Sequence, residues 1–203
     1  VRGTLAACQR RIRAYAEEQA RQGVERRRSA GTTVVAALLV EADGEPAWLL
    51  ANLGDSRIYR FTDGVLDQVS TDHSLVQELV AAGRIAPEEA ATHPERNVIT
   101  RALGDAVGVD ADYFVLPLAE AERVLLCSDG VSGMLDDPTI ATVLAEAADP
   151  RDAADRLVAA AVVAGGEDNA TAVVVDVVGV RDVEQYDAER QRASLEAKLG
   201  GRS

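Results

Sequence analysis

The chain has 203 residues, of which 47% are hydrophobic and only 3% aromatic, and it carries a formal net charge of −13. This length supports one well-buried domain, whose core must be built from Val, Leu, Ile and Ala. The negative charge argues against nucleic acid and anionic membranes as partners, because both would repel the protein. The sequence shows neither an apolar run of about eighteen residues nor a basic and hydrophobic leader, so we expect no membrane segment, no secretory signal and a cytoplasmic location.

The first third of the sequence predicts one helix followed by four strands. Leu5, Cys8, Ile12 and Tyr15 recur at three- and four-residue spacing, which indicates an amphipathic helix that ends just before Gly23. The strands that follow are rich in β-branched and aliphatic residues, and we predict that they form a four-stranded antiparallel meander. The predicted strands are 32–40, 47–53, 57–61 and 65–69, with Asp-Gly turn signals at 43–44 and 63–64.

The rest of the chain alternates helices with strands. Residues 72–104 are predicted to form a mostly helical insertion, in which Asp72 or Ser74 caps the first helix. Two later helices each begin with an Asp-Pro pair, at 137–138 and 149–150, and the acid of each pair is the expected N-cap. The closing strand 170–178 is almost wholly apolar, which predicts that both of its faces are buried. The other predicted elements are strands 113–116 and 123–127 and a charged helical tail at 182–199.

The sequence has two cysteines, Cys8 and Cys127. One lies in a helical pattern and the other in a strand pattern, where buried thiols are common. We therefore expect two reduced core residues and no disulfide between them.

Three carboxylates stand directly beside predicted strands. They are Asp55 in a GDS sequence, Asp129 in SDG and Asp168 in EDN. Unpaired carboxylates that lie close together repel one another, and proteins resolve this by raising a pKa, by supplying a basic partner or by binding a metal. No lysine lies near any of the three. Because no Cys or His is interleaved at zinc spacing, such a site is hard and would prefer Mg²⁺ or Mn²⁺. For each tripeptide by itself, a plain turn is the competing interpretation, since Asp followed by Gly, Ser or Asn is common in turns.

The order of the motifs along the chain is specific. GTT opens the first predicted strand, and NLGDSRIYR, TDHSLVQELVAAGRI, HPERNVITRALG, LLCSDG and GGEDNATAVVV follow. Over residues 1–178 this series resembles the bacterial branch of the protein phosphatase 2C family, the metal-dependent (PPM-type) Ser/Thr protein phosphatases. The resemblance implies an α+β fold, a four-layer α/β/β/α sandwich of two antiparallel sheets flanked by helices. It also implies that a metal-activated water hydrolyses phosphoserine and phosphothreonine in proteins, in signal transduction opposite Ser/Thr kinases.

The same resemblance implies roles for individual residues. Asp129 and Asp168 would be metal ligands and Asp55 the ligand of a third, weaker site, so that a complete enzyme would hold two or three Mg²⁺ or Mn²⁺ ions. Residues 71–97 would form a flap beside the active site that contacts the substrate. Loop geometry competes with a supporting role for the glycine and asparagine next to the ligands, and capping or surface roles compete with phosphate contact for the two histidines. The supporting residues would be Ser128, Gly130 and Asn169 at the metals and His73, His93 and Arg96 in the flap.

The sequence departs from the family pattern in one respect. The Asp-Gly-Met-Gly-Gly motif and the Asn-Glu-Asp-type motif, which supply the bridging Asp and the phosphate-binding Arg, do not occur in it. The resemblance therefore implies a domain at 1–178 that lacks its N-terminal strands and is impaired in activity, with a tail or linker at 179–203. A non-catalytic phosphatase-like binding or regulatory module is the alternative. A divalent-cation-binding β-domain unrelated to phosphate is a third hypothesis.

Overall fold

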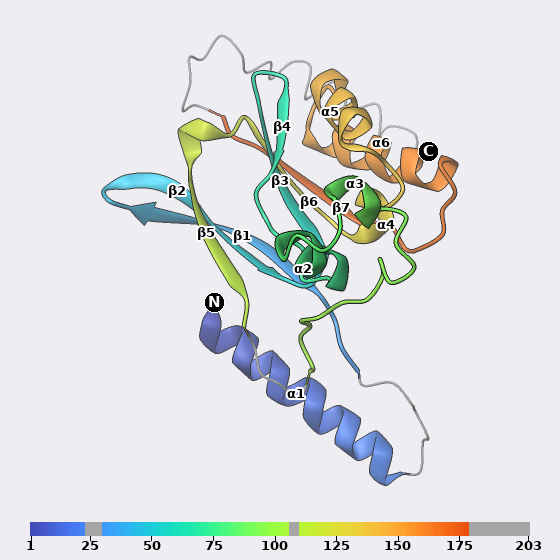
Figure 1. Ribbon diagram of the computed structural model, residues 1–203. Coiled ribbons are helices and arrows are strands. Elements are labelled where there is room, and N and C mark those ends of the chain that lie inside the picture. Colours follow the sequence, from blue (N-terminus) through green and yellow to red (C-terminus); the bar gives the residue numbers. More distant parts are fainter. Residues whose placement is uncertain (23–29, 106–109, 179–203) are drawn as a thin grey trace, which may run out of the picture. The chain divides into compact units, whose positions relative to one another are not determined.

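The computed structural model of the chain describes residues 1–22, 30–105 and 110–178 (Figure 1). Its strands form two antiparallel sheets flanked by helices, so the predicted α+β fold class is confirmed. The strands are β1 (Val34–Ala42), β2 (Glu45–Leu53), β3 (Arg57–Thr62), β4 (Val65–Gln68), β5 (Asp112–Pro117), β6 (Arg123–Cys127) and β7 (Ala172–Asp176). The helices are α1 (Arg2–Arg21), α2 (Leu75–Ala81), α3 (Pro87–Ala90), α4 (Asp129–Ser132), α5 (Asp137–Glu146) and α6 (Pro150–Val163).

Two compact units, each assembled from segments that are distant in sequence, make up the described chain. Unit 1 comprises Val1–Ala36, Ala51–Ser56 and Thr71–Tyr113. Unit 2 comprises Ala37–Leu50, Arg57–Ser70 and the chain from Phe114 onward. The predicted tail at 179–203 lies outside the described residues.

In unit 1, the core forms around one face of α1. Leu5 is buried against Leu53 and Leu103, and Cys8 and Ile12 pack beside it, so the predicted apolar stripe is confirmed over these turns. Tyr15 continues the stripe but is 56% exposed, because the core of this unit, as far as it is described, reaches α1 only up to Ile12. The helix ends at Arg21, and Gly23, its predicted stop, lies outside the described residues.

In unit 2, a four-stranded antiparallel sheet has the order β4-β3-β6-β7. Ile58 of β3 lies opposite Leu126 of β6, and Val124 of β6 lies opposite Val175 of β7. Helices α5 and α6 lie side by side along this sheet, and α6 packs on β7 (Figure 1). The core between the helices and the sheet is mainly aliphatic, as the composition predicts. Its largest fully buried side chains are Tyr59, Leu125, Val131, Ile140, Leu144 and Leu157.

The prediction of one four-stranded meander is wrong. β1 and β2 belong to a three-stranded sheet of order β1-β2-β5, whereas β3 and β4 belong to the other sheet. The chain changes sheet at residues 54–56, between the end of β2 and the start of β3. Apolar periodicity shows where strands lie along the chain but carries no information on which strands pair.

The prediction that the closing strand is buried on both faces is also wrong. β7 is shorter than predicted, and Val173 is 51% exposed. Within the described chain β7 is an edge strand, so only one neighbouring strand and α6 cover it. A wholly apolar strand can be buried on both faces, but only if other elements of the fold pack against each face.

The helix starts follow the capping signals closely. Asp149 is the N-cap of α6, as predicted, and its side chain accepts a hydrogen bond from Asp152 N at 2.8 Å. α5 begins one residue earlier than its Asp-Pro pair predicts, because Asp136 rather than Asp137 accepts from Thr139 N, at 3.0 Å. Asp caps the helix in both cases, since its carboxylate satisfies a backbone N–H that lacks an intrahelical partner.

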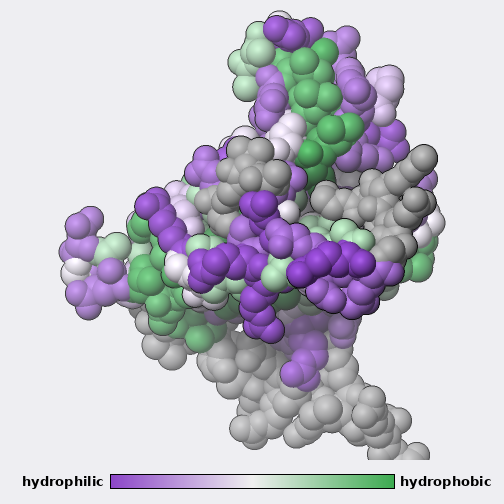
Figure 2. Space-filling model, turned by 90° about the horizontal axis from the view of Figure 1, so that it is seen from below, coloured by the Kyte–Doolittle hydropathy of each residue, from purple (hydrophilic) through white to green (hydrophobic). Residues whose placement is uncertain are grey.

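The two cysteines are free thiols, as predicted; Cys127 is buried and Cys8 is half-buried. Among the helices that the structure describes, none combines the length and the apolar character that a membrane crossing requires. Hydrophilic residues cover much of the face shown in Figure 2, with hydrophobic stretches between them.

Candidate metal centre

Two of the three predicted carboxylates lie on neighbouring segments of unit 2. Asp129 is the first residue of α4, directly after β6, and Asp168 lies in the loop between α6 and β7. Ser128 joins the two segments: its N–H donates to Thr171 O at 3.0 Å, and its Oγ accepts from Thr171 N at 3.0 Å. The Ser128 hydroxyl in turn donates to Asn169 O at 3.2 Å. The antiparallel pairing of β6 with β7 therefore brings the SDG and EDN motifs together.

Gly130 allows these two segments to approach closely. A Cβ at this position would lie 2.4 Å from Asn169 O and 2.8 Å from Asn169 C, and both are backbone atoms. Any side chain here would push the two carboxylate-bearing segments apart, so the glycine is required by close packing.

Asp129 and Asp168 have the chemistry of ligands for a hard cation. Both are exposed, and one oxygen of each carboxylate accepts from the next backbone N–H: Gly130 N at 3.0 Å from Asp129 Oδ1, and Asn169 N at 2.6 Å from Asp168 Oδ1. Within the described part of the chain, neither forms an ion pair with a basic side chain. These residues therefore fit Mg²⁺ or Mn²⁺, of which Mg²⁺ commonly uses one or two carboxylates and keeps several waters.

The described residues nevertheless gather no group of three or more His, Cys, Asp or Glu side chains that could hold a metal. Asp129 and Asp168 would thus supply only part of the protein ligands that a metal ion needs. The third predicted ligand, Asp55, belongs to unit 1 and is half-buried.

Asp55 lies in a turn whose conformation is tightly restrained. Gly54 has a φ of +110°, and a Cβ on it would lie 2.3 Å from Thr33 Cγ2 and 2.6 Å from Thr33 Cβ. On the other side of Asp55, the hydroxyls of Ser56 and Thr33 are hydrogen-bonded at 2.9 Å. The GDS sequence is therefore a specific turn between β2 and β3, which presents one carboxylate in a defined place.

Gly54→Ala is expected to lower the free energy of unfolding by about 3 kcal/mol, because the alanine would combine left-handed backbone strain with a clash against Thr33. Urea unfolding would measure the loss. Gly44→Ala is the control: Gly44 also has a positive φ, +83°, but open space surrounds its Cβ position, so a loss of only about 1 kcal/mol is expected. Equal losses in the two variants would contradict the steric restraint.

The flap region at 71–97 contains two short helices, α2 and α3. Ser74, one of the two predicted caps, accepts from Gln77 N at 3.3 Å at the start of α2. His93 is half-buried and its Nδ1 accepts from Glu95 N at 3.1 Å, a local contact within its own turn, and Arg96 is exposed. The described structure thus leaves Arg96 accessible and engages His93 Nδ1 in a local turn contact.

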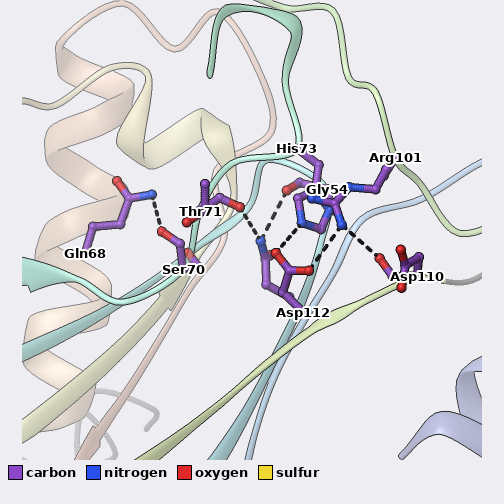
Figure 3. A network of polar contacts seen from close by, with 9 residues as sticks. Gly54, Gln68, Ser70, Thr71, His73, Arg101, Asp110 and Asp112 are labelled. Atoms are coloured by element: carbon purple, nitrogen blue, oxygen red, sulfur yellow. Dashed lines mark hydrogen bonds and ion pairs between the residues drawn. The ribbon is translucent and has the colours of Figure 1, made fainter. Parts of the chain in front are cut away.

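His73, the third predicted flap residue, is buried, with 1% of its surface exposed. Its Nδ1 accepts from Gly54 N at 3.1 Å, and its Nε2 lies 3.1 Å from Asp112 Oδ2 (Figure 3). Both ring nitrogens are therefore used inside unit 1. This arrangement favours a role within the fold over direct contact with phosphate.

Sequence reasoning missed the partners of His73. Asp112 starts β5, and its second oxygen accepts from Arg101 Nη1 at 3.1 Å. Partial burial raises the pKa of Asp112, but the hydrogen bonds from His73 and Arg101 outweigh it, and the pKa lies below its ordinary value. No sequence signal pointed to either residue, because an Asp at a strand start and an Arg in a loop are both unremarkable.

Comparison with known proteins agrees with this architecture. The family model described as protein phosphatase 2C matches residues 1–164. The serine/threonine phosphatase stp of Listeria monocytogenes serotype 4b is 39% identical over 146 residues, which are 72% of this chain and 56% of that protein. The serine/threonine protein phosphatase PstP of Mycobacterium tuberculosis is 43% identical over 129 residues, which are 64% of this chain and 25% of that protein.

Solved structures show the same likeness. The serine/threonine phosphatase Stp1 from Staphylococcus aureus has a TM-score of 0.78 and 34% identity, and the match covers 88% of this chain and 66% of that one. The catalytic domain of PstP in complex with two manganese ions has a TM-score of 0.63 and 37% identity, with 81% and 66% covered. This chain belongs to the protein phosphatase 2C family. It spans a little over half the length of the stp protein that it matches.

Proposed function

We propose that the chain hydrolyses phosphoserine and phosphothreonine in proteins with the help of Mg²⁺ or Mn²⁺. The observation that carries the proposal is the junction of β6 and β7, which brings Asp129 and Asp168 together without a basic partner in the described chain. The relatives reported above are named as serine/threonine phosphatases, and one of their structures contains two manganese ions. Phosphorylated proteins are accordingly the proposed substrates, with Ser/Thr kinases acting in the opposite direction in the cytoplasm.

The proposed roles of the residues follow from their positions. Asp129 and Asp168 would hold the ions, and Asp55 would hold an additional, weaker one. Bound divalent ions supply a water of lowered pKa and neutralise charge on the phosphate. Ser128 and Gly130 keep the two ligand segments in contact, and the Asn169 N–H orients the Asp168 carboxylate. Arg96 and His93 would contact the substrate from the flap, and no protein nucleophile is required.

The other two hypotheses have less support. Membership of the family argues against a cation-binding domain unrelated to phosphate. A non-catalytic module is not favoured by the relatives, which are named as phosphatases. The impairment expected from the motifs that the printed sequence lacks stays a prediction, and the assay below tests it.

The decisive experiment is the release of phosphate from a phosphothreonine peptide by the 203-residue chain. We expect turnover that depends on added Mn²⁺ or Mg²⁺, is stopped by a chelator and is lost in Asp168→Ala. The same preparations would be checked for folding by circular dichroism and for Mn²⁺ binding by calorimetry. A folded chain that binds Mn²⁺ but releases no phosphate would overturn the proposed activity of this chain, and would leave either a phosphatase impaired by the motifs it lacks or the non-catalytic module.

A further inference from the structure

The backbone of Gly54, the residue before Asp55, is held on both of its polar groups by one buried histidine. The Gly54 N–H donates to His73 Nδ1 at 3.1 Å, and the His73 N–H donates back to Gly54 O at 3.0 Å. Asn52, which is fully buried, donates through its side-chain amide to the same carbonyl at 3.4 Å and to Thr71 O at 3.0 Å. The turn that presents Asp55 is thus held in place by His73, which lies 19 positions after Gly54 in the chain.

The two contacts of the ring assign its tautomer. Because Nδ1 accepts from the Gly54 N–H, it carries no proton, so the proton of the neutral ring is on Nε2. Nε2 then donates to Asp112 Oδ2, and Asp112 Oδ1 accepts from Arg101. The imidazole is therefore oriented by a carboxylate on one side and supports a backbone amide on the other.

The main chain of His73 is anchored as well. Thr100 N donates to His73 O at 2.8 Å, and the next contact along, from Leu75 N to Val98 O, is 2.9 Å. Arg101, one residue beyond this ladder, also donates to Asp110 O at 3.3 Å. These main-chain hydrogen bonds fix the position of the His73 ring next to the Gly54 turn. A displacement of the ring would therefore also displace the Gly54 amide.

We propose that His73 is a positioning residue for Asp55: through its Nδ1 contact with the Gly54 amide, it holds the turn in the conformation in which Asp55 binds a divalent cation. This inference rests on the proposed function, because it takes Asp55 as a ligand. It assigns His73 no contact with substrate or metal. Partners that orient a metal ligand commonly contribute about 10- to 100-fold to metal affinity.

Two substitutions distinguish the contributions of the two hydrogen bonds that the ring nitrogens make. In His73→Asn, the amide oxygen can take the place of Nδ1 and accept from Gly54, while the contact with Asp112 is lost. In His73→Gln, the longer amide can reach Asp112 in the place of Nε2, while the Gly54 N–H loses its acceptor. Each variant loses one side-chain hydrogen bond, so the two should lose similar amounts of stability.

The first measurement is amide hydrogen exchange of Gly54 in the metal-free 203-residue chain. We expect slow exchange in the wild type and in His73→Asn, and exchange at least about tenfold faster in His73→Gln, because only that variant removes the acceptor. Equal protection in all three proteins would overturn the proposal. This result does not depend on any metal and so tests the contact separately from the proposed function.

The second measurement is Mn²⁺ titration by calorimetry. The component of the Mn²⁺ binding signal that is present in the wild type and lost in Asp55→Asn is assigned to the ion at Asp55. We expect His73→Gln to weaken this component about 10- to 100-fold and His73→Asn to retain most of it. Leu5→Ala, which destabilises the core of unit 1, should lower the melting temperature and leave the component unchanged. An Asp55-dependent ion that is unaffected by His73→Gln would overturn only this inference. The absence of such an ion in the wild type would overturn the ligand role of Asp55 and with it the role of His73.

Discussion

Replacing Asp129 or Asp168 with alanine is expected to lower the Mn²⁺ affinity of the chain by more than about 100-fold. The reason is that each variant would remove one of the two proposed carboxylate ligands, whereas the loss of an orienting partner alone costs about 10- to 100-fold. Both side chains are exposed and fill no core volume. Stability should therefore change by no more than about 0.5 kcal/mol. Calorimetric titration with Mn²⁺, beside thermal unfolding of the metal-free proteins, measures both effects.

Glu167→Ala provides the matched control for Asp168→Ala. Glu167 is the neighbouring residue, is exposed and carries the same charge, but the proposal gives it no ligand role. Its removal should leave Mn²⁺ affinity within about twofold of the wild type, because only the long-range attraction of one screened charge is lost. Unchanged affinity in both aspartate variants would contradict their role as ligands. Equal losses in Glu167→Ala and Asp168→Ala would show that general negative charge, and not a specific ligand, attracts the ion.

Gly130→Ala is expected to reduce Mn²⁺ affinity at least about tenfold although it leaves every carboxylate in place. The new methyl group would meet Asn169 O at 2.4 Å, Asn169 C at 2.8 Å and Ala170 Cα at 3.1 Å. All three are backbone atoms, so no side-chain rotation relieves the clash, and the SDG and EDN segments must separate. Overpacking of this kind also costs about 1–3 kcal/mol of stability.

Gly3→Ala is the control for this glycine. It lies in α1, and nothing is found within 4 Å of its Cβ position. Alanine is the better helix former, so this variant should gain about 0.5–1 kcal/mol and keep its Mn²⁺ affinity. If Gly130→Ala bound Mn²⁺ as tightly as the wild type, the close approach of the two segments would not be what holds the ligands together.

Much of the secondary structure was predictable because its signals are local. Each predicted strand has a counterpart within the described chain, shifted by a few residues at its ends, and Asp149 caps its helix as expected. The motifs containing Asp55, Asp129 and Asp168 were visible for the same reason, as acidic turns beside apolar runs. Family membership followed from their order along the chain.

The sequence by itself therefore determined the elements, the aliphatic core, the acidic motifs and the family. Only the tertiary structure decided which strands share a sheet, that one face of β7 is open at Val173, and that His73 is buried against Gly54 and Asp112. The two contacts of His73, for example, join residues that lie 19 and 39 positions apart in the chain. Hydrophobic periodicity and turn chemistry report the preferences of neighbouring residues, whereas pairing and burial depend on which distant segments meet.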